Sequence, residues 1–528
     1  MKRSLRVFGL ALVGWSCCFL SGALAQAPRS AIPWLSESLE APMTHAPATE
    51  APSPLVPEPV AVTPLAPALR DAIGVLPSET TGFSPNLWGP TDAATARQLV
   101  RETPEAGLPE AQALLIRLLL AETDPPEDDS GGESLLTARI DRLLREGALE
   151  QADALIAFAN PVSPADPALF RRWFDIGLLT DRTQPPCDAL RRNPALSPTL
   201  PARIFCLARG GDWNAAEITL TLGKHLGSIP PDQEALLGRF LDPVLFEEAP
   251  VPPVSEPMTP LDFLMREAVG LPRPPGPLPR AFLHHDLTVH TPMRIRIEAA
   301  ERLVRTGAIS YAPLLAAFRA GAPAASGGVW DRASAIQALD AALGTGDQDE
   351  VAPALAEADA RLTEAGFRVA LAEGYADRLA LIPPRSVPEE TRTRIFELLL
   401  LAGLPGPALA YAPDEPAPRH AALLAILDGE GPLAEFSDRD QGPAAEAVVS
   451  AFSDSASQDL LEQSGRTEIS EGRQGEVILR AVGSLSDGDR TPPPALARAL
   501  AALRAVGQED AARQIAVEAL LQGGLDVH

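Results

Sequence analysis

Side chains of the kind that bind metals gather in one histidine-rich stretch near the middle of the chain. His284 and His285 are adjacent, Asp286 follows them, and His290 comes four residues later. Neutral imidazole and carboxylate groups are ligands of zinc and copper. The spacing matches no helical or finger-type metal site, and prolines on both sides predict a loop. We expect surface histidines here and keep a metal site formed by His284, His285 and His290 as the alternative.

A serine nucleophile is the second chemistry to consider, at Ser326-Gly327-Gly328. A nucleophile elbow has the pattern Gly-x-Ser-x-Gly directly after a strand. Ala324 occupies the first glycine position, and no strand-like alternation precedes it. The stretch therefore predicts a loop that enters a helix at Trp330. With no other catalytic motif, the sequence predicts neither catalytic residues nor a cofactor, and we do not expect an enzyme.

The N-terminus has the three parts of a secretory signal. Lys2, Arg3 and Arg6 form a basic region, an apolar run covers 7–20, and Ala23-Leu24-Ala25 is a small-x-small cleavage site. Cleavage there would start the mature chain at Gln26. The alternative is an uncleaved inner-membrane anchor, because an apolar run that extends to Ala25 is just long enough to span a bilayer. A signal of this style indicates a bacterial periplasm.

Two cysteines remain after the signal is removed, Cys187 and Cys206. The bacterial periplasm is oxidising, so paired cysteines form disulfides there. The sequence therefore predicts a disulfide bond between Cys187 and Cys206. A bridge that closes a loop of about 20 residues stabilises a folded chain by roughly 3 kcal/mol in chain-entropy treatments.

Composition favours helices and excludes two classes of partner. Hydrophobic residues make up 46% of the chain, mostly Ala and Leu, and aromatic residues only 5%. This mixture is typical of helices rather than sheets. The formal net charge is −26, which repels nucleic acid and anionic lipid. Beyond the signal we find no apolar run long enough to span a membrane.

One short pattern, Leu-x3-Gly-x4-Ala, occurs five times. A leucine in the last turn of a helix, a glycine that permits a left-handed turn, and a small residue in the next helix would form a helical hairpin. Repetition of one hairpin indicates stacked repeats. The copies are Leu143/Gly147/Ala152, Leu207/Gly211/Ala216, Leu303/Gly307/Ala312, Leu399/Gly403/Ala408 and Leu503/Gly507/Ala512.

This pattern resembles the tetratricopeptide repeat (TPR) in part. That family places Leu or Tyr, Gly and Ala at these spacings, followed by a large and then a small residue. Leu220 and Gly223 fit those last two positions, whereas Arg319 and Glu415 depart from them in two other copies. The resemblance implies an all-α, right-handed superhelix of antiparallel helix pairs that binds other proteins, and it implies no chemistry.

The order of segments follows from composition. After the signal peptide (1–25) we expect a disordered Pro-rich segment (26–90), a helical-repeat array (91–246), a Pro-rich linker (247–279) and a second array (280–528). Apolar periodicity predicts helices through both arrays, among them 135–146, 149–159, 167–179, 188–192, 351–364 and 389–401.

One apolar motif interrupts the Pro-rich segment. Ile32, Trp34, Leu35 and Leu39 lie among polar residues and prolines. A short helix would place Leu35 and Leu39 on one face, beside a tryptophan of the kind that anchors interfaces. The motif is either a docking peptide, for a groove of this chain or for a partner, or part of a plain linker.

The sequence thus predicts a periplasmic helical-repeat scaffold or assembly factor that binds proteins of a cell-envelope machine, for instance of motility or secretion. The alternatives are a periplasmic binding protein for a small ligand or metal, and a cell-wall hydrolase on a helical scaffold. We expect envelope proteins as partners, no nucleic acid, and no membrane span in the mature chain.

Overall fold

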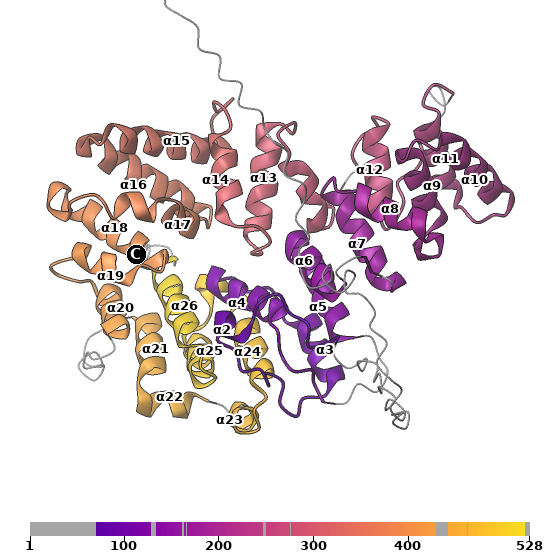
Figure 1. The fold of residues 1–528 in the computed structure, drawn as a ribbon. Helices are drawn as coiled ribbons and strands as arrows, with labels where there is room; N and C mark the ends of the chain where they lie inside the picture. The colour runs from indigo at the N-terminus through magenta and orange to yellow at the C-terminus, as the bar shows by residue number, and fades with distance from the viewer. Residues whose placement is uncertain are drawn as a thin grey trace, which may run out of the picture. The chain divides into compact units, whose positions relative to one another are not determined.

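The computed structural model describes residues 70–127, 134–160, 163–164, 166–245, 250–274, 276–428, 442–461 and 463–522. Within these ranges the chain is helical and contains no strand (Figure 1). The expected all-α class is confirmed. The predicted signal peptide and the apolar motif with Ile32, Trp34, Leu35 and Leu39 lie outside the described residues.

Helices follow one another along the chain with short connections. The first group comprises α2 (Ser78–Thr81), α3 (Ala93–Glu102), α4 (Pro109–Leu120), α5 (Leu135–Glu146), α6 (Leu149–Ala159), α7 (Pro167–Leu179), α8 (Gln184–Arg192), η2 (Pro194–Leu196), α9 (Leu200–Arg209), α10 (Trp213–His225), α11 (Pro231–Leu241) and α12 (Pro260–Ala268).

The second group continues to the C-terminal end of the described chain. It comprises η3 (Arg280–Leu287), α13 (Met293–Val304), α14 (Tyr311–Arg319), α15 (Val329–Thr345), α16 (Gln348–Glu364), α17 (Arg368–Leu379), η4 (Pro384–Ser386), α18 (Glu389–Leu401), α19 (Pro405–Ala408), η5 (Leu409–Tyr411), α20 (Pro418–Asp428), α21 (Pro443–Phe452), α22 (Asp454–Leu460), α23 (Gln463–Ser470), α24 (Gln474–Gly483), η7 (Gly488–Arg490), α25 (Pro493–Ala505) and α26 (Glu509–Gln522).

The five motif glycines end their helices in one common way. Each glycine has a left-handed backbone, with φ between 65° and 85°. In each copy the N–H of the next residue donates to the carbonyl of the motif leucine at 2.8–3.1 Å. This is the six-to-one bond of a Schellman turn, which satisfies a free carbonyl at a helix end. The predicted turn is therefore confirmed in all five copies.

The packing role of the motif alanine is confirmed in four copies and is wrong in the fifth. Ala152, Ala216, Ala408 and Ala512 are fully buried, whereas Ala312 is exposed. In the four regular copies the second helix starts two residues after the glycine. In the Gly307 copy α14 starts four residues after it. The later start turns Ala312 away from the preceding helix.

Two hydrophobic clusters form the interior. The smaller one is built from α7 to α12 and contains Phe170, Phe205 and Met265. The larger one draws side chains from α3 to α7 and from α12 onwards. Within the predicted linker, α12 contributes Phe263 to the larger cluster and Met265 to the smaller one. This stretch therefore packs against both clusters.

Residues 70–90, expected to be disordered, are folded. Leu87 and Trp88 are buried in the larger cluster, and the N–H of Gly475 in α24 donates to the Leu87 carbonyl at 2.8 Å. A Cβ at Gly475 would lie 2.8 Å from the Trp88 ring, so only glycine fits against it. The apolar side chains of this stretch gain enough burial on α24 to offset the entropy of ordering it.

Helices from the two predicted arrays pack together. α4 contacts α24 and α26, and α3 contacts α24 (Figure 1). The N–H of Gly107, just before α4, donates to the Leu485 carbonyl at 2.9 Å. The boundary expected at 247–279 therefore does not divide the larger hydrophobic cluster.

Candidate functional site

A cavity of about 890 Å³ lies among α4, α14, α17, α26 and the end of α18. Its size is within the range of small-molecule and peptide-binding pockets. The walls carry several acidic side chains and a tyrosine, among them Glu110 of α4, Tyr311 of α14, Glu373 of α17 and Glu518 of α26. The packing of α4 against α26 brings these groups together.

Glu518 is the most deeply buried of the three carboxylates. Its two oxygens accept hydrogen bonds from the N–H of Glu110 at 2.9 and 3.1 Å. That N–H belongs to the first turn of α4, where it has no partner within the helix and where the helix dipole favours negative charge. Glu518 therefore caps α4 from the opposite end of the chain.

The four groups influence one another's protonation. Burial raises the pKa of Glu518 well above its ordinary value, and the charges of Glu110 and Glu373 add to this effect although the backbone bond opposes it. Burial also raises the pKa of Glu373, as does the charge of Glu110. The pKa of Tyr311 is raised by burial and then by the three carboxylates. The groups therefore share one acidic environment.

The cations on the cavity wall already have partners. Arg117 pairs with Glu110 at 2.6 Å. Arg305 donates to the Ala365 carbonyl at 2.9 Å and stacks on the Phe367 ring. Arg513 pairs with acidic residues of its own helix, α26. Among the described residues, Glu373 and Glu518 make no ion pair. Arg305 likewise has no carboxylate partner among these residues.

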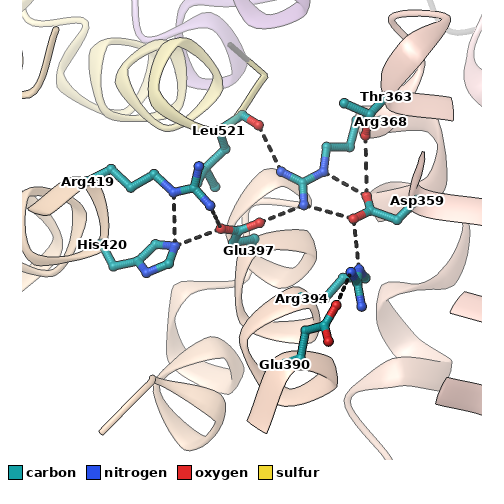
Figure 2. A network of polar contacts seen from close by, with 9 residues as sticks. All are labelled: Asp359, Thr363, Arg368, Glu390, Arg394, Glu397, Arg419, His420 and Leu521. Carbon is teal, nitrogen blue, oxygen red and sulfur yellow. Dashed lines mark hydrogen bonds and ion pairs between the residues drawn. The ribbon is translucent and has the colours of Figure 1, made fainter. Parts of the chain in front are cut away.

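A buried polar network holds the C-terminal end of α26 beside this cavity (Figure 2). Arg368 of α17 donates to the Leu521 carbonyl at 2.8 Å, to Asp359 at 2.8 and 3.1 Å, and to Glu397 at 2.6 Å. A guanidinium presents its donors in a rigid fork, so Arg368 joins α17 to three other helices, α16, α18 and α26. The position of Glu518, three residues before Leu521, depends on this network.

Glu397 of α18 is the acceptor at the centre of the network. His420 and Arg419 of α20 each contact the same Glu397 oxygen at 2.7 Å (Figure 2). Burial alone would raise the pKa of Glu397, but the hydrogen bond to His420 and the charges of Arg368 and Arg419 lower it to about 2. Glu397 is therefore ionised, and the network is a structural element without an open coordination position.

A second candidate surface is the outer face of α10. Ile218, Leu222 and Leu226 lie four residues apart and are 68%, 57% and 68% exposed. The opposite face of α10 is buried through Ala216 and Leu220. A helix that is apolar on both sides is normally covered on both sides. No described residue covers this outer face.

The histidines of the alternative metal site do not converge. His284 contacts the Gly147 carbonyl at 2.6 Å, His285 contacts the Glu267 carboxylate, and His290 is exposed. Asp286 is paired with Arg273. Across the described ranges, no three His, Cys, Asp or Glu side chains are arranged to hold a metal ion. The stretch forms η3, a 3-10 helix, where a loop was expected.

The predicted disulfide and the Ser326-Gly327-Gly328 stretch both lie within the described residues. Cys187 and Cys206 form the predicted disulfide, with Cα atoms 5.1 Å apart, in the smaller hydrophobic cluster. Gly327 donates to Asp331 at 2.8 Å as the chain enters α15. Trp213, at the start of α10, is 51% exposed.

No pattern in the sequence predicted that the glutamates of the cavity lie together. Glu110 and Glu518 are 408 residues apart, and each stands alone in an ordinary amphipathic helix. The outer face of α10 did have a signal, because Ile218, Leu222 and Leu226 form a second apolar stripe. It was not recognised, since a helix with two apolar sides is also what a buried helix shows.

Comparison with protein-family models, curated proteins and solved structures finds no match to this chain. No helix in the described ranges is both long enough and apolar enough to cross a bilayer.

Proposed function

We propose that this protein is a periplasmic helical-repeat scaffold that binds other proteins of a cell-envelope machine, of motility or secretion for instance. The observation that carries the proposal is the uncovered apolar face of α10. Contiguous exposed apolar side chains on a soluble protein mark interaction sites. Three side chains at i, i+4 and i+8 are the pattern through which a helix packs against a partner's groove or helix.

The proposal includes a TPR-like stacking of helix pairs. Support comes from the five turns that share a left-handed glycine and one hydrogen bond, and from four buried alanines at the same offset. Arrays of this kind expose long surfaces while each helix pair contacts only its neighbours. That architecture suits a protein that binds other proteins, and the proposal assigns the chain no catalytic role.

Export to the periplasm is the other part of the proposal. The disulfide between Cys187 and Cys206 is compatible with a location outside the cytoplasm. The basic and apolar N-terminal residues with the Ala23-Leu24-Ala25 site favour removal of the first 25 residues.

The test is recovery of partners with a variant of the α10 face. The exported protein is purified from envelope extracts as the parent and as the double variant Ile218→Glu/Leu222→Glu. We expect the parent to retain at least one protein in stoichiometric amount and the double variant to lose it. The melting temperature should not change, because both side chains are exposed.

The matched control is Leu381→Glu. Leu381 is 83% exposed and lies after α17, away from α10 in the chain, so the same chemical change is made outside the proposed face. It should retain the partner. The proposal is contradicted if the parent recovers no stoichiometric protein, or if the double variant and Leu381→Glu recover it equally.

One observation favours the alternative of a periplasmic binding protein for a small ligand. It is the cavity of about 890 Å³ among α4, α14, α17 and α26, which is separate from α10. Nothing on the described surfaces favours the cell-wall hydrolase.

A further inference from the structure

We infer that the disulfide between Cys187 and Cys206 controls the apolar face of α10, so that this face is held in its binding form only while the two sulfurs are bonded. The inference rests on the proposed function, because it concerns the regulation of the surface that the scaffold uses. Cytoplasmic thiols are kept reduced, whereas the periplasm is oxidising. Partner binding through α10 would therefore begin only after export.

The disulfide lies in the part of the fold that supports α10. Cys187 belongs to α8 and Cys206 to α9, and both are buried in the smaller hydrophobic cluster. α9 is the helix against which α10 folds back after the turn at Gly211. The disulfide therefore fixes α9 relative to α8, and α9 in turn supports α10.

α10 buries little apolar area of its own. Its buried residues are Ala216, Leu220 and Gly223, and of these only Leu220 has a large side chain. A Cβ at Gly223 would lie 2.7 Å from the side chain of Leu200 in α9, so the two helices are in close contact there. Packing of an apolar face supplies most of the stability of a helix in a protein. α10 should therefore open more readily than a helix with several large buried side chains.

The larger hydrophobic cluster gives the helices around the disulfide little direct support. α8, α9, α10 and α11 make their main contacts with one another and with α7 and α12. By contrast, α18 in the larger cluster buries Ile395, Phe396 and the four leucines of 398–401. Loss of the disulfide should therefore loosen α9 and α10 and leave α18 unchanged.

Formation of the disulfide is a two-electron oxidation by thiol–disulfide exchange. The thiolate of one cysteine attacks a disulfide of the oxidant, either a disulfide-exchange protein or a small-molecule disulfide, and releases one thiol of that oxidant. The thiolate of the second cysteine attacks the mixed disulfide and releases the other thiol. The chain loses two electrons and two protons, and the oxidant gains both. Because the two sulfurs are buried, the folded chain protects the bond from reductants.

The experiment is hydrogen–deuterium exchange of the purified exported protein, measured by mass spectrometry in the oxidised and the reduced state. Both samples are unfolded in denaturant and refolded, one of them with a reductant present throughout. Cys187 and Cys206 are the only cysteines beyond the predicted signal, so the samples differ at one bond. We expect the amides of α9 and α10 to exchange about a hundredfold faster in the reduced chain, the order that chain-entropy treatments give for a loop of this length. The amides of α18 should exchange at the same rate in both samples.

A double variant decides the question if the reduced chain does not refold. Cys187→Ala/Cys206→Ala, produced and exported like the parent, should show the exchange pattern expected of the reduced chain. The matched control is Ile204→Val, which removes one buried carbon from α9 and keeps the disulfide. It should accelerate exchange in α9 and α10 by about tenfold or less.

The inference is overturned if the amides of α10 exchange equally fast with and without the disulfide, or if α18 is accelerated as much as α10. The exchange experiment needs no partner, so its result does not depend on the proposed function. With the partner recovered from envelope extracts, the reduced chain should lose binding as Ile218→Glu/Leu222→Glu does. Equal recovery by both redox states contradicts the inference alone, whereas recovery of no partner by the oxidised parent contradicts the proposed function.

Discussion

Two buried charged residues hold the C-terminal end of α26 in place. Arg368 has several acceptors and Glu397 several donors, and neither is exposed to solvent. A buried ion pair contributes modestly as a whole, but loss of one partner leaves the other charge uncompensated. The network should therefore be sensitive to removal of its central carboxylate.

Glu397→Ala should lower the free energy of unfolding by about 3–5 kcal/mol at pH 7. The reason is that Arg368 would stay buried with one of its two acidic partners missing. Glu390→Ala, on the same helix, is the matched control because Glu390 is 82% exposed and pairs only with Arg394. It should cost less than about 1 kcal/mol. Equal losses in denaturant titrations of the two variants would show that the network does not stabilise the fold.

Lowering the pH should reproduce part of the fall in unfolding free energy that is expected for Glu397→Ala. The pKa of Glu397 in the folded chain, about 2, is below its ordinary value of 4.5. The ionised carboxylate therefore contributes stability above about pH 4.5, and this contribution disappears as the pH falls from 4.5 towards 2. Stability of Glu397→Gln should fall less over that interval than stability of the parent.

Which residues meet in these sites could not be predicted from the sequence. Glu397 stands in a leucine-rich helix that was predicted with both ends correct, 389–401. Its partners, however, are 22 to 29 residues away on other helices. Local patterns give the face of a helix that is buried, and the partner of a buried charge depends on the tertiary packing.

At the scale of elements, caps explain which helices could be predicted to the residue. α5 matches its predicted range because Ser134 accepts a bond from the Thr137 N–H and Gly147 ends the helix. α16 begins three residues before its predicted start, because Asp347 caps it and Pro353 is accommodated inside it. Helices α22 and α23 were not predicted, since their short polar sequences show no apolar period.

The left-handed turns give a direct prediction at this scale. Gly211→Ala should destabilise the protein by about 1 kcal/mol, because φ is 85° and a left-handed backbone is strained for any residue with a Cβ. No atom lies within 4 Å of the added Cβ, so the effect is backbone strain alone. Gly344→Ala, within α15 and also in open space, should stabilise the protein by about 0.5 kcal/mol.

Thermal and denaturant unfolding of the two glycine variants compares them directly. The two changes add the same methyl group and differ only in backbone conformation. Shifts in the same direction would mean that the repeated turn is not held by the conformation of its glycine.

At the scale of the whole described chain, the sequence predicted the all-α class. It did not predict the contacts that pack the N-terminal helices of the described chain against its C-terminal helices. Nothing local indicates that Gly107 approaches Gly488, although a Cβ on Gly107 would lie 2.3 Å from the Gly488 nitrogen. The Leu87–Gly475 bond and the cap of Glu518 on α4 likewise join residues hundreds of positions apart. Such contacts depend on how many helices stack between them, and a repeat pattern with irregular copies does not determine that number.

The central claim is that the outer face of α10 binds another protein in the periplasm, and site-specific photocrosslinking in cells tests it most directly. A photoreactive residue replaces Leu222 on this face or, as the control, exposed Leu381. The account predicts a discrete crosslinked product between position 222 and one other protein, absent at position 381. Absence of any product at position 222, or the same products at both positions, would contradict it.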